Sequence, residues 1–140
     1  MTSMKTRTFA ETSLGEQLPE LAIPITVTLI NGGAIATRDY FPGPHDVEAA
    51  RELGSPHIFM NILTTTALVQ RFVEAWAGPL GVFKDIQIKL GVPNYPGDTM
   101  IFSGQVSERD EASRTVVISL KGRNSMGNHA AGTVSLTLPE

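Results

Sequence analysis

The sequence contains no cysteine. This absence excludes disulfides, zinc–thiolate sites and thiol nucleophiles, so the chain must be held together by packing. Charged residues are also few, at 18% of the chain, and the eleven lysines and arginines are scattered singly. We therefore expect no nucleic-acid partner, because a surface that follows a phosphate backbone needs clustered basic side chains.

Long apolar runs are missing as well. Pro24 and the segment 31–33 interrupt the most apolar stretch, so no segment has the length that a membrane helix needs. The first twelve residues are polar and lack the apolar centre of a secretory signal. We expect a cytoplasmic protein with no membrane partner.

The 140 residues, 41% of them hydrophobic, suit one domain with a single core. Residues 1–18 are polar and aperiodic, which predicts a flexible N-terminal arm before a folded domain over residues 19–140. Early in this domain, 21–30 is rich in β-branched residues and alternates with threonine, which predicts a strand. The small residues of 31–37 permit a short helical turn.

Two helices are predicted from capping signals and periodicity. Asp46 is suited to cap a short helix over 47–53, because Gly54 follows as a stop. A stronger signal covers 61–77, where apolar and small residues recur at steps of three and four before Gly78. We expect this segment to be the central helix of the domain.

From Pro79 onward the apolar period changes from helical to two, which predicts four strands. We expect these strands to form a four-strand meander. A single long amphipathic helix is available to cover the sheet, so the economical packing is an antiparallel sheet curled around that helix, the α+β hotdog architecture. Such a layer leaves sheet edges uncovered, and we therefore expect a dimer or larger assembly.

Asp39 and His45 lie on one loop rich in proline and glycine. A carboxylate and an imidazole on one loop can activate a single water molecule near neutral pH. Alternatively, Asp39 caps a turn and His45 is a partly exposed loop residue. A metal site is not expected, because His45, His57 and His129 lie far apart and match no known ligand spacing.

The start of the long helix, at Met60, Asn61 and Ile62, is the second candidate. Backbone N–H groups at a helix start are unpaired and can hold the developing oxyanion of a thioester enolate. Every helix has such an end, however, and the alternative is that Asn61 is only an N-cap.

The order of these features resembles the MaoC-like, R-specific enoyl-CoA hydratase family of hotdog proteins. The resemblance covers 18–138, and its sharper motifs are Tyr95-Pro-Gly-Asp-Thr99 and Asn124-Ser-Met-Gly127. Within the family, the chain is most similar to the small subunits of actinobacterial steroid side-chain hydratases. That similarity is carried by Ala36-Thr-Arg-Asp39, Ile58-Phe-Met-Asn-Ile-Leu63, Leu68-Val-Gln-Arg71, Trp76-Ala-Gly-Pro79 and Leu90-Gly-Val-Pro93.

The resemblance implies hydration of a trans-2-enoyl-CoA, with no cofactor beyond the CoA thioester substrate. Asp39 and His45 would orient and deprotonate water, and the start of the long helix would hold the enolate oxygen. The chain departs from the family in its loop, because the family histidine usually lies five positions after the aspartate. Here Pro44 is the fifth residue and His45 the sixth.

The resemblance also implies a homodimer, or a heteromer with a related hotdog subunit that makes room for a bulky acyl group. Where the family commonly has His-Gly-Met, this chain has Met60-Asn61-Ile62. The side chain of Asn61 would either narrow the thioester channel or add an amide donor. Two alternatives to a hydratase remain, a non-catalytic acyl-CoA-binding partner subunit and a hotdog thioesterase.

Overall fold

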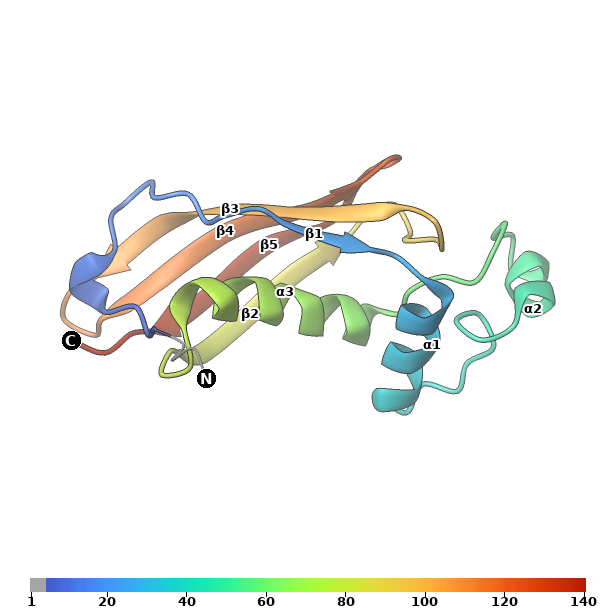
Figure 1. Cartoon of the computed structure of the whole chain (residues 1–140), viewed down its shortest axis with the longest axis horizontal. Coiled ribbons are helices and arrows are strands. Elements are labelled where there is room, and N and C mark those ends of the chain that lie inside the picture. Colours follow the sequence, from blue (N-terminus) through green and yellow to red (C-terminus); the bar gives the residue numbers. More distant parts are fainter. Residues whose placement is uncertain (1–4) are drawn as a thin grey trace.

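The computed structural model describes residues 5–140, and Met1–Met4 lie outside this range. The fold is α+β, as predicted, with a five-stranded antiparallel sheet curled around one long helix (Figure 1). The elements are the 3-10 helix η1 (Phe9–Glu11), β1 (Leu21–Pro24), α1 (Val27–Ala36), α2 (Val47–Glu52), α3 (Ile62–Ala77), β2 (Val82–Leu90), β3 (Thr99–Asp110), β4 (Thr115–Asn124) and β5 (Gly127–Thr137).

The order of the strands in the sheet is β1-β3-β4-β5-β2. Only β3, β4 and β5 form a meander, so the predicted four-strand meander is wrong for β2. This strand pairs with β5, with Ile86 opposite Val134, and forms one edge of the sheet. At the other edge, β1 pairs with β3. Period-two patterning identifies strands but not their neighbours, which explains the error.

The segment between β2 and β3 crosses from one edge of the sheet to the other beside the start of α3. Its first residues continue the pairing with β5, where Gly91 N–H donates to the carbonyl oxygen of His129. Further along, the carbonyl oxygen of Asn94 accepts from Met60 N–H at 3.2 Å. The segment then reaches the end of β1, where Ile25 N–H donates to the carbonyl oxygen of Asp98 at 2.8 Å.

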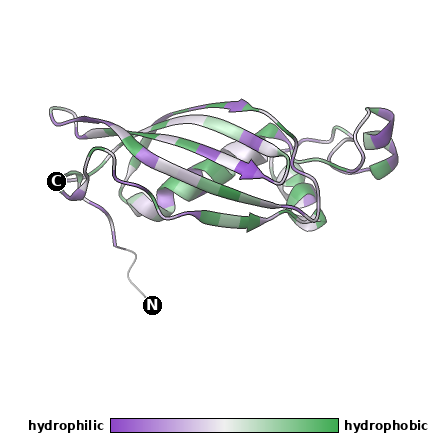
Figure 2. Cartoon of the chain, turned by 90° about the horizontal axis from the view of Figure 1, so that it is seen from above, coloured by the Kyte–Doolittle hydropathy of each residue, from purple (hydrophilic) through white to green (hydrophobic). Residues whose placement is uncertain are grey.

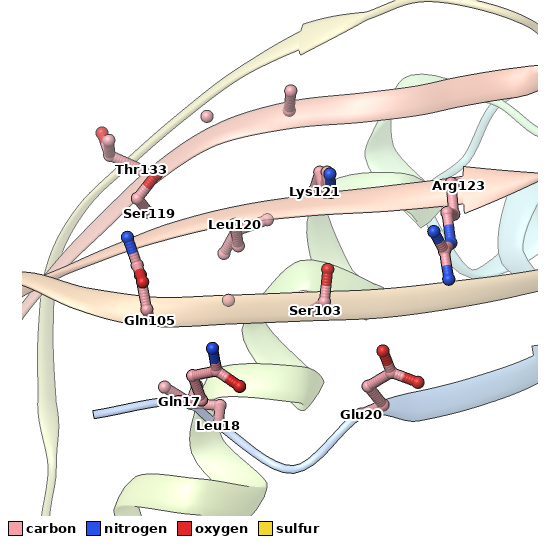
Figure 3. A pocket seen from close by; sticks show the side chains of 13 residues that line it. Gln17, Leu18, Glu20, Ser103, Gln105, Ser119, Leu120, Lys121, Arg123 and Thr133 are labelled. Atoms are coloured by element: carbon pink, nitrogen blue, oxygen red, sulfur yellow. The ribbon is translucent and has the colours of Figure 1, made fainter. Parts of the chain in front are cut away.

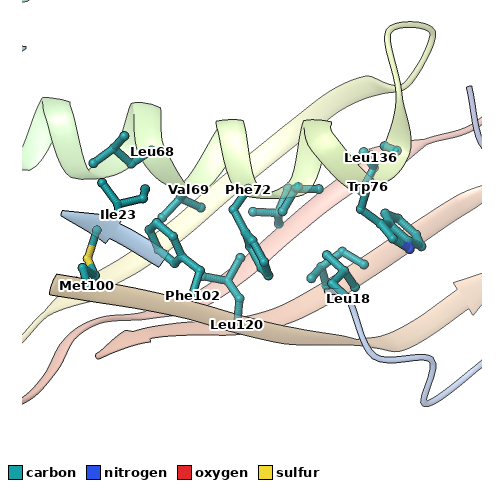
Figure 4. Packing of buried hydrophobic residues seen from close by; sticks show 14 of the residues in the cluster. Leu18, Ile23, Leu68, Val69, Phe72, Trp76, Met100, Phe102, Leu120 and Leu136 are labelled. Atoms are coloured by element: carbon teal, nitrogen blue, oxygen red, sulfur yellow. The ribbon is translucent and has the colours of Figure 1, made fainter. Parts of the chain in front are cut away.

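The hydrophobic core lies between α3 and the inner face of the sheet. Along the strands hydrophobic and hydrophilic residues alternate (Figure 2), and most of the buried residues of the sheet are hydrophobic. Phe72 of α3 stacks on Phe102 of β3, with ring centroids 5.3 Å apart (Figure 4). Burial of such side chains is the main favourable term for this fold. The buried residues of α3 are Thr64, Thr65, Leu68, Val69, Phe72, Val73, Trp76 and Ala77.

The predicted strand over 21–30 is wrong beyond Pro24, because a ten-residue helix, α1, begins at Val27. Thr26 caps this helix through its side-chain oxygen, which accepts from Leu29 N–H at 3.0 Å. The buried positions Ile30 and Ala34 then recur at the helical spacing of four. Tertiary packing thus overrides the β-branched composition, which had indicated a strand.

The other two helices match the prediction. Asp46 caps α2 by accepting from the N–H groups of Glu48 and Ala49. Asn61 caps α3, and Gly78 follows its last residue with a φ of 83°, which favours glycine. Both α1 and α2 lie beyond the N-terminal end of α3 (Figure 1), where the loop with Asp39 and His45 is found.

The predicted N-terminal arm over 1–18 is wrong for residues 5–18, which pack onto the domain, and residues 1–4 lie outside the described range. Phe9 and Leu18 are buried in the core. Backbone hydrogen bonds hold the segment, among them Arg7 N–H to the carbonyl oxygen of Ala77 and Leu18 N–H to that of Gly104. A few anchoring contacts therefore order a segment whose composition alone suggests an arm.

Within residues 5–140, no helix is long and apolar enough to cross a membrane.

Replacing Phe102 with alanine should lower the free energy of unfolding by about 3–5 kcal/mol, because the ring is fully buried and its removal leaves a cavity against Phe72. The matched control is Leu80→Ala, whose side chain is 66% exposed and should change stability by less than about 0.5 kcal/mol. Urea denaturation measures both. Equal effects of the two substitutions would contradict this account of the core.

Candidate functional site at the start of the long helix

Asp39 lies three residues after Ala36, the last residue of α1. The chain turns at Arg38, which has a φ of 55°, and Asp39 N–H donates to the carbonyl oxygen of Ala34 at 2.8 Å. This turn points the half-buried Asp39 toward the start of α3. One carboxylate oxygen, Oδ1, accepts from Phe41 N–H at 3.1 Å, and the other, Oδ2, accepts from the side-chain amide of Asn61 at 2.9 Å.

His45 is brought back to Asp39 by a tight turn at Pro42, whose carbonyl oxygen accepts from His45 N–H at 2.9 Å. The imidazole Nε2 lies 2.6 Å from the backbone carbonyl oxygen of Asp39. A carbonyl can only accept, so Nε2 carries a hydrogen in this contact, and in the neutral form of the ring Nδ1 has a lone pair. Pro44, which occupies the usual family position of the histidine, is buried, and its carbonyl oxygen accepts from Asn31 Nδ2.

The start of α3 adjoins this loop. Of the three predicted oxyanion residues, Met60 has its N–H occupied by the carbonyl oxygen of Asn94, so it is not free to hold a ligand. Within residues 5–140, the backbone N–H groups of Asn61 and Ile62 have no hydrogen-bond acceptor. The side-chain amide of Asn61, in contrast, is fully used, as a cap of α3 and as a donor to Asp39 and Thr37.

A second histidine supports α3 one turn further on. His129 is 2% exposed, and its Nδ1 lies 2.7 Å from the carbonyl oxygen of Val92. Its Nε2 lies 2.8 Å from the hydroxyl of Thr65 on α3. Burial holds the pKa of the His129 imidazole below its ordinary value. The neutral ring therefore donates from Nδ1 and accepts from Thr65, tying β5, α3 and the crossing segment together.

Comparison with known proteins identifies the family. The chain is 43% identical over 127 residues to the 3-oxo-4,17-pregnadiene-20-carboxyl-CoA hydratase beta subunit of Mycobacterium tuberculosis, and the match covers 91% of this chain and 97% of that protein. The chain belongs to the MaoC-like family of hotdog hydratases. No protein-family model matches it.

Solved structures agree with this assignment. A chain of the ChsH1–ChsH2 complex from Mycobacterium tuberculosis has a TM-score of 0.88 and 43% identity, over 91% of this chain and 98% of that one. The R-hydratase PhaJ1 from Pseudomonas aeruginosa, at 18% identity, has a TM-score of 0.87 over 95% of this chain and 86% of its own. At that identity the likeness shows the hotdog fold alone.

The two sharper motifs of this MaoC-like chain contact each other, away from Asp39. The carboxylate of Asp98, in the first motif, accepts from the hydroxyl of Ser125, in the second, at 2.6 Å. This hydrogen bond, together with the backbone N–H groups of Thr99 and Ser125, holds the pKa of Asp98 below its ordinary value. The motifs therefore lock the turn between β4 and β5 onto the crossing segment.

A groove on the outer face of the sheet lies apart from the site. It has a volume of about 780 Å³ and crosses β3, β4 and β5, where the polar side chains of Gln105, Lys121 and Arg123 point away from α3 (Figure 3). None of the predicted site residues lines it. Among residues 5–140, no cluster of three or more histidine, aspartate or glutamate side chains could hold a metal ion.

The free energy of unfolding should fall as the pH is lowered below about 6.5, because the unfolded chain binds a proton at His129 more readily than the folded chain does. The loss continues until the pH reaches the lowered pKa of the folded state, with a slope of at most about 1.4 kcal/mol per pH unit from this group. Urea denaturation between pH 5 and pH 8 measures it.

The comparison variant is His129→Gln, which can still donate to Val92 and accept from Thr65 but does not titrate. Its stability should depend less steeply on pH than that of the parent over the same interval. Parallel curves for the two proteins would exclude His129 as the source of the pH dependence.

Proposed function

We propose that the chain hydrates a trans-2-enoyl-CoA to the 3-hydroxyacyl-CoA, with Asp39 and His45 activating the water. The observation that carries the proposal is the contact between His45 and Asp39 beside the start of α3. His45 Nε2 lies 2.6 Å from the backbone carbonyl oxygen of Asp39, and the carboxylate of the same Asp39 bonds to Asn61, the N-cap of α3. The 43% identity to a hydratase beta subunit supports the same reaction class.

In this proposal, His45 Nδ1 accepts a proton from a water molecule whose oxygen attacks the β-carbon of the enoyl group. The carboxylate of Asp39 orients that water by accepting its other hydrogen. Negative charge moves to the thioester oxygen, which the free N–H groups of Asn61 and Ile62 are suited to hold. Transfer of the proton from His45 to the α-carbon then completes the addition of one water across the double bond and restores the neutral imidazole.

A bulky apolar acyl group fits the surroundings of Asp39. Tyr40 and Phe41 follow it in the loop and are 72% and 50% exposed, and Ile62 and Leu63 at the start of α3 are 50% and 51% exposed. Large apolar side chains gathered around a polar centre are typical of sites for apolar ligands. The relative named for a pregnadiene carboxyl-CoA supports a steroid-like substrate for this chain as well.

A related hotdog subunit is the proposed partner. The similar chain from Mycobacterium tuberculosis was solved in a complex of two named components, ChsH1 and ChsH2. In the present chain β2 lies at the edge of the sheet and pairs only with β5 among the described strands. An open edge of nine residues is a ready surface for a second sheet. Activity should therefore be assayed with the partner subunit present.

One observation favours a second candidate function, a non-catalytic acyl-CoA-binding subunit. His45 contacts the backbone carbonyl of Asp39, not its carboxylate, and Pro44 occupies the usual family position of the histidine. In that case the chain binds acyl-CoA and the chemistry belongs to the partner.

Asp39→Asn and His45→Ala should each lower the hydration rate of the complex by about 10²- to 10⁴-fold, the usual contribution of a general acid or base. Matched controls are Asp46→Asn, which retains an N-cap of α2, and His57→Ala, whose imidazole bonds only to the adjacent Ile58 N–H among the described contacts. The loss of enoyl-CoA absorbance measures the rate.

Both controls should retain the rate of the parent. Parent-like rates in Asp39→Asn and His45→Ala would favour the binding subunit over the hydratase. Release of free CoA by the parent would instead indicate a thioesterase.

A further inference from the structure

We infer that Asn61 is a positioning residue, whose side-chain amide holds the carboxylate of Asp39 in place at the N-terminus of α3. This inference deepens the proposed function and rests on it, since it concerns the same site. Asn61 is only 8% exposed, so its amide groups need protein partners, and the structure supplies one for each.

The hydrogen bonds fix the orientation of this amide without ambiguity. Asn61 Oδ1 lies 2.9 Å from Thr64 N–H, which can only donate, so the atom at that position must be the oxygen. Asn61 Nδ2 lies 2.9 Å from Asp39 Oδ2, which as a carboxylate oxygen only accepts. If the amide were flipped, its nitrogen would face the Thr64 N–H and its oxygen would face the Asp39 carboxylate, and both hydrogen bonds would be lost.

The second hydrogen of the Asn61 side-chain amide is bonded to Thr37 and not to Asp39. The Thr37 hydroxyl has one hydrogen, which it donates to the backbone of α1, at 2.8 Å from the carbonyl oxygen of Gly33. Its lone pairs are therefore free to accept from Asn61 Nδ2 at 3.0 Å. One hydrogen of the amide points to Thr37 and the other to Asp39. The carboxylate is thus tied to both α1 and α3.

Few charged groups lie near Asp39, so its carboxylate depends on the neutral amide of Asn61 to hold it in place. α1 has no charged side chain, and the first one in α3 is Arg71, almost three turns from the helix start. From its own loop, Asp39 is flanked by the exposed Arg38, while His45 contacts its backbone carbonyl oxygen. Asp46 directs its carboxylate to the start of α2. The carboxylate itself is held by Asn61 Nδ2 and Phe41 N–H.

Asn61→Asp tests this role with almost no change of shape. The new carboxylate still caps α3, because aspartate is as good an N-cap as asparagine. Its other oxygen, however, would face the Asp39 carboxylate at the distance of a hydrogen bond. Two carboxylates that close share a proton, so the site should take up a proton at a higher pH than in the parent.

Asn61→Ser separates the two functions of the residue. Serine is a good N-cap, so α3 should keep its start, but its short side chain cannot reach Asp39. The Asp39 carboxylate is then free to move, and a small misplacement of a catalytic group reduces the chemical step strongly. We expect kcat to fall roughly 10- to 100-fold with little change in KM.

The experiment compares the parent complex with both variants and with Asn128→Asp, an exposed control that adds the same charge. The acidic limb of the kcat/KM profile should move to higher pH by about one unit or more in Asn61→Asp and stay in place in Asn128→Asp. The unfolding temperature should be near that of the parent in Asn61→Ser, and in Asn61→Asp it should approach the parent value as the pH is lowered and the shared proton is taken up. A structural role alone predicts the reverse, a lower unfolding temperature with an unchanged pH profile, and would overturn the inference.

A second readout separates this inference from the proposed function. The carboxyl ¹³C signal of Asp39, assigned by its loss in Asp39→Asn, can be titrated whether or not the complex turns over substrate. A midpoint at higher pH in Asn61→Asp than in the parent supports the positioning role even if no hydration is found. An unchanged midpoint overturns that role, even if hydration is found.

Discussion

The hydrogen bonds at the start of α3 determine how the helix, the sheet and the candidate site are placed relative to one another. A helix that begins inside a protein leaves N–H groups that must be bonded or put to use. Here the side chain of Asn61 takes one of them, and the main chain at Met60 is tied to Asn94 on the crossing segment. One turn later, Thr65 bonds to the buried His129 of β5. These contacts fix the helix end against the crossing segment and β5.

The position of the candidate site follows from this anchoring. α1 packs against α3 where Gly33 leaves room for Thr64, since a side chain at Gly33 would collide with the threonine. That close approach brings the end of α1, and hence Asp39, to the side chain of Asn61. His45 then reaches the main chain of Asp39 from the same loop. The site is therefore assembled by helix packing, beside backbone N–H groups at the start of α3 that have no acceptor within residues 5–140.

Local patterns in the sequence predict much of this fold but not its long-range pairing. The central helix and the cap at Asp46 were predictable because capping and periodicity act over a few residues. α1 was missed, since β-branched residues indicate a strand until packing decides otherwise. Asp39 and His45 are suggested by the family resemblance. The bond between Asp39 and Asn61 joins residues 22 apart in sequence, and no pattern in the sequence indicates it.

The most direct test of the account is the product formed when the chain, with its partner subunit, is given a trans-2-enoyl-CoA in deuterated water. Addition of water at the start of α3 predicts a 3-hydroxyacyl-CoA that carries deuterium at the α-carbon, with no free thiol released. Mass spectrometry and NMR identify that product. Free CoA, or bound enoyl-CoA that is recovered unchanged, would contradict the account.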